Sequence, residues 1–103
     1  MTRVADIKFI NKMGNKCKQL SKDTVYTLHL DYPYFETHKP FTHQFKTSSK
    51  GMTFLELWAM IWKQYKVLYG TPGYTFFHDI EGIFLEDIEI DYQKKIITPS
   101  IGS

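Results

Sequence analysis

The sequence has very little cysteine, and this excludes several classes of protein. Cys17 is the single cysteine among 103 residues, so the chain cannot form an internal disulfide or a zinc site with several cysteine ligands. A lone thiol is typical of proteins in a reducing compartment. The longest apolar run, Leu57 to Trp62, has six residues, whereas a membrane-spanning helix needs about 20. Because no apolar signal segment follows the first residues, we expect a cytoplasmic protein with no membrane partner.

The sequence also lacks the spacings that usually mark catalytic and metal sites. It has no glycine-rich phosphate loop, no serine elbow and no EF-hand pattern. His78 stands beside Asp79, but adjacent side chains on an extended chain point to opposite faces. His29, His38 and His43 do not have the spacing of metal ligands. We therefore predict a protein that is not an enzyme and that holds no metal and no cofactor.

Apolar and aromatic residues are abundant, at 43% and 17% of the chain. Such a composition can fill a hydrophobic core, and a chain of this length suits one domain. Charge is divided unevenly along it. Residues 1–50 carry nine Lys and Arg against four Asp and Glu, a balance of +5, whereas residues 51–103 carry four against seven, a balance of −3. Solvated faces explain such runs in most proteins, although a basic and an acidic part can also serve different partners.

The clearest local signal is a helix that begins after Thr53. Thr53 and Glu56 have the spacing of a capping box, in which each side chain bonds the backbone N–H of the other residue. At the other end, Gly70 is predicted to close the helix in the left-handed conformation, and Pro72 prevents its continuation. The sequence therefore predicts one long helix between Gly51 and Gly73.

The apolar arc of this helix spans roughly 160°, which is wider than a one-sided contact requires. One edge of the arc is aliphatic and should lie on a sheet. The other edge is aromatic and contains Trp58, Trp62 and Tyr69. We expect this second edge to be covered by a loop, by the segment 74–78 or by a partner.

Strands are predicted on both sides of the helix. Residues 24–32 alternate between apolar and polar side chains, and residues 41–47 do so again, so the two should pair as an antiparallel hairpin. Residues 83–91 form the next predicted strand, with a bulge at Glu86 and Asp87. A last strand begins at Lys95, and Pro99 near its end is compatible with a position at the edge of the sheet.

These elements predict an α+β fold: a mixed sheet of four or five strands with one long helix packed across it. The chain is expected to be a single domain, 1–103, in which residues 1–22 form a peripheral Lys-rich strand or turn segment. The order of elements over residues 24–101 resembles the β-grasp arrangement of ubiquitin-like proteins. The chain ends in Ile101-Gly102-Ser103 and not in a diglycine, so no conjugation chemistry is carried over. The resemblance implies a recognition module.

Two candidate binding surfaces follow. The first is an aromatic surface for a protein partner, made of a proline-containing loop and the aromatic edge of the helix: Tyr32, Tyr34, Phe35, Trp58 and Trp62. The second is a basic segment that could contact phosphates: Lys8, Lys12, Lys16, Lys18 and Lys22. The chain has only one arginine, which argues against nucleic-acid binding by this segment. We therefore predict a small non-catalytic protein-interaction module, with a nucleic-acid-binding accessory protein as the alternative.

Overall fold

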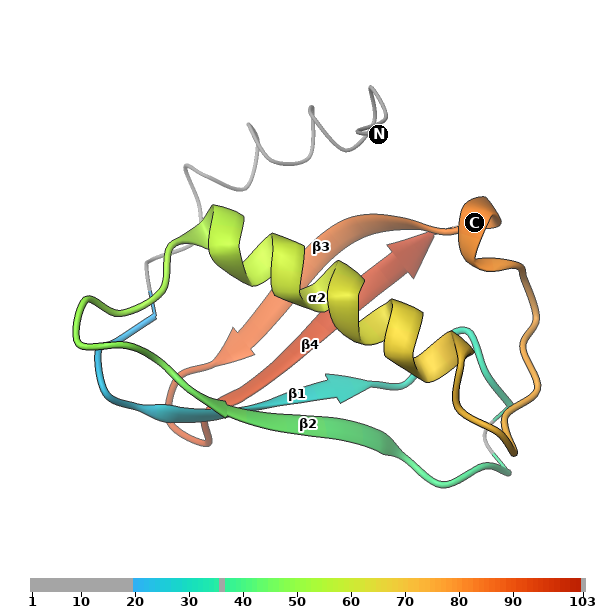
Figure 1. Cartoon of the computed structure of the whole chain (residues 1–103), viewed down its shortest axis with the longest axis horizontal. Coiled ribbons are helices and arrows are strands. Elements are labelled where there is room, and N and C mark those ends of the chain that lie inside the picture. The colour runs from blue at the N-terminus through green and yellow to red at the C-terminus, as the bar shows by residue number, and fades with distance from the viewer. Residues whose placement is uncertain (1–19, 36, 103) are drawn as a thin grey trace.

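The computed structural model describes residues 20–35 and 37–102 (Figure 1). Its elements, in chain order, are β1 (Val25–Leu30), β2 (Phe41–Lys46), α2 (Phe54–Tyr69), the short 3₁₀ turn η1 (Ile80–Gly82), β3 (Phe84–Asp91) and β4 (Ile96–Gly102). The segment expected to be peripheral, residues 1–22, lies outside the described residues except for its last three. Of the five candidate lysines, Lys8, Lys12, Lys16 and Lys18 are therefore outside the described residues.

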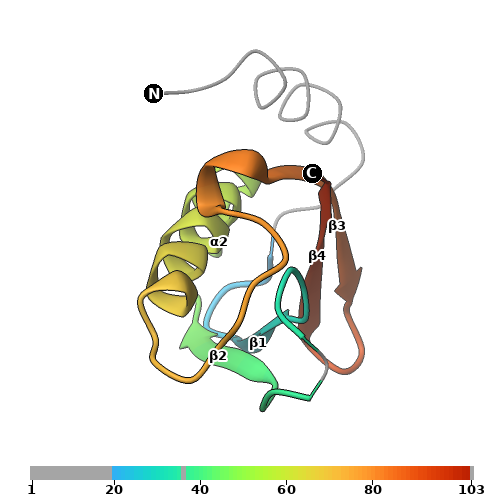
Figure 2. The ribbon, with the colours of Figure 1, turned by 90° about the vertical axis from the view of Figure 1, so that its right-hand side faces the viewer.

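The described strands form one mixed sheet in the order β2-β1-β4-β3. β1 is antiparallel to β2 and parallel to β4, and β3 is antiparallel to β4. Helix α2 crosses one face of this sheet, so the fold has two layers (Figures 1 and 2). The predicted α+β fold with a mixed sheet and one long helix is confirmed, and the described part of the sheet has four strands. The resemblance to β-grasp domains stays a prediction.

The hairpin of β1 and β2 follows the predicted alternation. Tyr26, Leu28 and Leu30 are completely buried beneath the helix, and the residues between them face the open side of the sheet. The register pairs Leu28 with His43 and His29 with Thr42. Residues directly opposite each other share a face, so His29 and His43 lie on opposite faces of the sheet.

The capping box at the start of α2 is present as predicted. The Thr53 hydroxyl accepts from the Glu56 N–H at 3.2 Å, and the Glu56 carboxylate accepts from the Thr53 N–H at 3.2 Å. The predicted left-handed closure at Gly70 is wrong. Gly70 has a φ of −89°, and its N–H donates to the carbonyls of the last helical turn. The positive φ is found at Gly73, at +94°, as expected for a glycine that follows a proline in a type II turn.

For the last two strands, one prediction is confirmed and one is wrong. The bulge is present, because the register of β3 against β4 shifts between Leu85 and Asp87. The strand that carries Pro99 is not at the edge, because β4 lies between β1 and β3. The pairing of β4 with β1 ends at Ile97. The N–H that Pro99 lacks is therefore not needed for pairing with β1.

The core lies between α2 and the sheet. Leu57, Ile61 and Leu68 from the helix pack in the same buried cluster as Leu28 and Ile97 from the sheet. This is the aliphatic edge that was expected to face the sheet. Among the described residues, no helix has the length and apolar character needed to cross a lipid bilayer.

Candidate functional site

Two loops that are far apart in the sequence meet at one end of the molecule (Figure 2). The first loop follows β1, and the second joins α2 to η1. Tyr34 forms an antiparallel bridge with Phe76. On either side of this bridge the Phe35 N–H donates to the Thr75 carbonyl at 3.2 Å, and the Phe77 N–H donates to the Pro33 carbonyl at 2.8 Å. The two loops therefore form a short two-stranded ribbon.

The ribbon directs alternate side chains inward and outward, as extended chains do. Tyr34 is only 4% exposed. Phe76 also points inward and stacks on Tyr69 of the helix, with ring centroids 4.0 Å apart. Phe35 and Phe77 point outward, are 38% and 50% exposed, and contact each other with centroids 4.2 Å apart. The ribbon thus presents two phenylalanines together at the surface.

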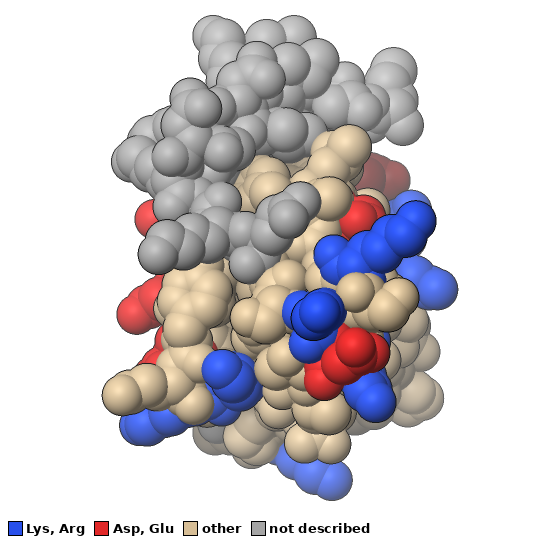
Figure 3. Space-filling view, turned by 90° about the vertical axis from the view of Figure 1, so that its left-hand side faces the viewer, with Lys and Arg blue, Asp and Glu red and all other residues tan. Residues whose placement is uncertain are grey.

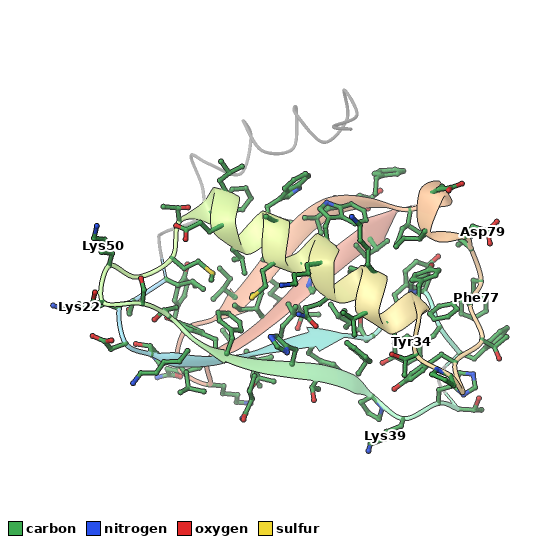
Figure 4. All side chains as sticks on the ribbon, viewed as in Figure 1. Lys22, Tyr34, Lys39, Lys50, Phe77 and Asp79 are labelled. Atoms are coloured by element: carbon green, nitrogen blue, oxygen red, sulfur yellow. The ribbon has the colours of Figure 1, made fainter. Side chains whose placement is uncertain are left out.

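Tyr32 and two histidines extend this exposed pair. The Tyr32 ring lies 6.2 Å from that of Phe77 and 6.4 Å from that of His78. His38 lies 6.4 Å from Phe35 on the other side. We call Tyr32, Phe35 and Phe77 the aromatic patch, with His38 and His78 at its border. Figure 4 shows that Phe77 and Asp79 lie on the same side of the molecule, at the end away from Lys22 and Lys50.

Tyrosine hydroxyls from the helix hold the loops of the patch in place. The Tyr65 hydroxyl donates to the Tyr32 carbonyl at 2.8 Å, and the Tyr69 hydroxyl donates to the His78 carbonyl at 2.7 Å. Burial raises the pKa of Tyr65. Burial, with a contribution from the negative charge of Asp79, raises the pKa of Tyr69 to about 12. Both phenols therefore remain protonated donors at neutral pH.

Further hydrogen bonds, within the first loop and between the two loops, fix the backbone of the first loop as well. The His38 N–H donates to the Phe35 carbonyl at 3.0 Å, and the His38 Nε2 accepts from the Thr75 N–H at 3.0 Å. The Tyr74 hydroxyl donates to the Lys39 carbonyl at 2.8 Å. The patch is thus built on a backbone that is bonded across both loops.

Tyr34 is a core residue and not the contact residue that we expected. Its hydroxyl donates to the Leu30 carbonyl at 2.6 Å and accepts from the Phe41 N–H at 3.1 Å. It therefore joins the two strands at the end of the β1–β2 hairpin where the connecting loop begins and ends. Burial, before any charge, raises the pKa of Tyr34. Of the two neighbouring candidates, only Phe35 is available at the surface.

Trp58 and Trp62 form a separate pair on the helix. Their rings lie 6.3 Å apart, and both side chains are half-buried. Among the described residues, no ring contact joins either tryptophan to the aromatic patch. Both indole N–H groups are buried, and neither has a hydrogen-bond partner in the part of the chain that the structure describes. The candidate surface predicted from the sequence is thus divided, since Phe76 covers the aromatic edge at Tyr69 and the tryptophans lie elsewhere.

Sequence reasoning missed Phe77, the more exposed member of the pair. The segment after the Pro72-Gly73 turn has aromatic side chains at three of its four positions, so a phenylalanine must point to each face of any extended chain there. That signal could have identified one outward phenylalanine. It could not have shown that Phe35 would be its neighbour.

A cleft of about 550 Å³ opens between the start of β2 and the turn after α2. It is lined by Lys39, Pro40, Phe41, Thr42, Thr71, Pro72, Gly73 and Tyr74. This lining has one cation and no carboxylate, so the cleft contains no acid–base pair. Among residues 20–35 and 37–102, no group of three or more His, Cys, Asp and Glu side chains is placed to hold a metal ion.

Lys22, the described member of the basic segment, is exposed at the end of the molecule opposite the aromatic patch (Figure 4). Figure 3 faces this end and shows acidic side chains among the lysines. The described surface there is mixed in charge.

The comparisons with known proteins add no relative. No family model matches the chain, and neither the curated proteins nor the solved structures give a significant match to it.

Proposed function

We propose that this protein is a small non-catalytic interaction module and that the aromatic patch is its contact surface for a protein partner. The observation that carries the proposal is the contact between Phe35 and Phe77 at the surface. Single exposed apolar side chains are ordinary in soluble proteins. Two phenylalanines from separate loops, in contact with each other and still exposed, are a small apolar surface of the kind that partners cover.

The rigidity of the patch supports a role in binding. Association costs free energy when loops and side chains must be ordered. Here the two loops are already bonded to each other and to the tyrosines of α2. A partner would therefore meet a surface that needs little further ordering. Aromatic side chains on such surfaces often carry most of the binding free energy.

The chemistry of this end of the molecule also favours binding over catalysis. The phenols beneath the patch are used as hydrogen-bond donors to carbonyls.

The single cysteine suits the cytoplasm, and we place the protein there as part of the proposal.

The test compares proteins captured from a lysate of the native host by three immobilised forms of the chain. They are the wild type, Phe35→Ser with Phe77→Ser, and the control Leu55→Ser with Val67→Ser, which changes two exposed apolar residues of α2. We expect the wild type and the control to capture the same protein, and the patch variant to lose it. Equal capture by all three forms would refute the assignment of the patch.

Nucleic-acid binding stays the alternative prediction and has its own test. Lysine contacts to phosphate release counterions, so such binding must weaken steeply between about 50 and 200 mM salt. Fluorescence anisotropy with mixed DNA and RNA fragments measures this directly. Salt-dependent binding that survives loss of the patch would favour the alternative.

A further inference from the structure

The two edge strands of the described sheet are protected to different degrees against pairing with another chain. β3 has a bulge and four acidic side chains: Glu86, Asp87, Glu89 and Asp91. Bulges and charges are the features that keep edge strands from pairing. β2 has six residues with no recorded bulge and no proline, and its single charge, Lys46, is at its end. β2 is therefore the open edge.

The backbone groups on this open edge can be identified. Hydrogen bonds alternate along an antiparallel pair, so every second residue points its N–H and C=O toward the partner strand. The Thr47 N–H donates to the Thr24 carbonyl, and the Tyr34 hydroxyl links the Leu30 carbonyl to the Phe41 N–H. The backbone N–H and C=O groups of residues 41, 43, 45 and 47 therefore point toward β1. The backbone groups of Thr42, Gln44 and Lys46 point away from it.

The helix-facing side of β2 is also incompletely covered. Phe41, His43 and Phe45 are each half-buried, whereas Tyr26, Leu28 and Leu30 of the neighbouring strand are completely buried. The rings of His43 and Phe45 stack 6.2 Å apart, with planes 12° from parallel. Within residues 20–35 and 37–102, β2 thus combines backbone groups that point away from its neighbouring strand with partly exposed aromatic side chains.

We propose that β2 pairs antiparallel with β2 of a second copy of this chain, about a two-fold axis perpendicular to the sheet. The two sheets would join into one continuous sheet with both helices on the same face. Residues directly opposite each other share a face, so the aromatic set of one copy meets the aromatic set of the other. Two-fold dimers with self-complementary surfaces are the commonest homo-oligomers.

Charge favours this edge over the other. Lys46 is at the end of β2, so a register that pairs most of the strand does not place it opposite Lys46 of the second copy. The same pairing of two β3 strands would bring carboxylates against carboxylates, which is destabilising. The proposal does not depend on the aromatic patch, which is formed by other loops.

The test is the mass in solution, measured by sedimentation velocity from about 5 to 200 µM, because a dimer is favoured by concentration. We compare the wild type with Thr42→Lys plus Gln44→Lys, which places lysine opposite lysine in each face-matched register. The matched control is Thr27→Lys plus Thr98→Lys, on the same open face but in the interior strands β1 and β4. We expect the wild type and the control to reach the mass of two chains, and the edge variant to remain a monomer.

A wild type that stays monomeric throughout this range would overturn the proposal, and so would an edge variant that still dimerises. If the edge variant does not fold, hydrogen exchange of the wild type decides the matter. The amides of Thr42, Gln44 and Lys46 should then become protected as the concentration rises. Unchanged exchange at these three amides would also overturn it.

Discussion

Tyr34 and Phe35 are neighbours in one loop, and Phe76 and Phe77 are neighbours in another, yet the two members of each pair have opposite environments. Tyr34 and Phe76 face inward, where one closes the β1–β2 hairpin and the other stacks on Tyr69. Phe35 and Phe77 face outward and contact each other. The difference comes from the alternation of an extended chain once the two loops are bonded together. One aromatic-rich ribbon can therefore contribute side chains from one face to the core and side chains from the other face to the surface.

The largest effect should come from an inward residue of this ribbon. Tyr34→Ala removes a buried ring and the hydroxyl that links Leu30 to Phe41. We expect the free energy of unfolding to fall by about 3 to 5 kcal/mol, as for other buried aromatic residues. Urea unfolding measures the change. A loss below about 1 kcal/mol would show that the inward face contributes little.

The link between the helix and the patch should have the next largest effect. Tyr65→Phe keeps the ring in the core but leaves the Tyr32 carbonyl without this donor. We expect a loss of about 1 to 3 kcal/mol, the cost of leaving a partly buried polar group unpaired. The same urea titration applies, and an unchanged midpoint would mean that the hydroxyl does not hold the loop.

The capping box should have a smaller effect, far from both loops. Thr53→Ala removes the acceptor for the Glu56 N–H and should cost about 1 kcal/mol. Because this site is remote from the ribbon, partner capture should be unchanged. Loss of capture by this variant would contradict the separation of stability from binding.

Alkaline pH should weaken the contact between the helix and the second loop. The folded pKa of Tyr69, about 12, lies above the ordinary value of 10.0 expected in the unfolded chain. Its contribution is therefore fully present below pH 10 and is lost as the pH rises through 12. Tyr69→Phe should remove this part of the pH dependence in unfolding experiments between pH 9 and 12. An identical profile for the variant would exclude Tyr69 as its source.

The parts of the fold that depend on neighbouring residues could be predicted from the sequence. The alternation of Tyr26, Leu28 and Leu30 and the capping box at Thr53 are both signals within a few residues, and both are confirmed. The bulge after Leu85 could be predicted from the sequence for the same reason, since two acidic residues interrupt an apolar pattern. Local patterns thus gave the elements and their inward faces.

The parts that depend on distant contacts could not be predicted. The direction of Tyr34 is set by its bridge to Phe76, 42 residues later, and nothing in the loop sequence indicates that partner. The same holds for Pro99, whose tolerance in β4 depends on where the pairing with β1 ends. The surface predicted from the sequence therefore includes Phe35 but not Phe77, the residue that Phe35 contacts in the structure.

The smallest effect on stability should come from the outward pair. Phe35→Ser with Phe77→Ser removes two exposed rings, and surface substitutions usually change stability by less than about 0.5 kcal/mol each. Urea unfolding should therefore give nearly the wild-type free energy. A loss comparable to that of Tyr34→Ala would place these rings in the core and remove the distinction between the two faces.

The central claim is that the outward pair is used for binding, and the most direct measurement is partner capture by the folded Phe35→Ser, Phe77→Ser variant. The amount of partner retained is quantified beside the wild type and the Leu55→Ser, Val67→Ser control. The proposal predicts that only the patch variant loses the partner while its unfolding free energy stays close to that of the wild type. Full capture by the folded patch variant would contradict it.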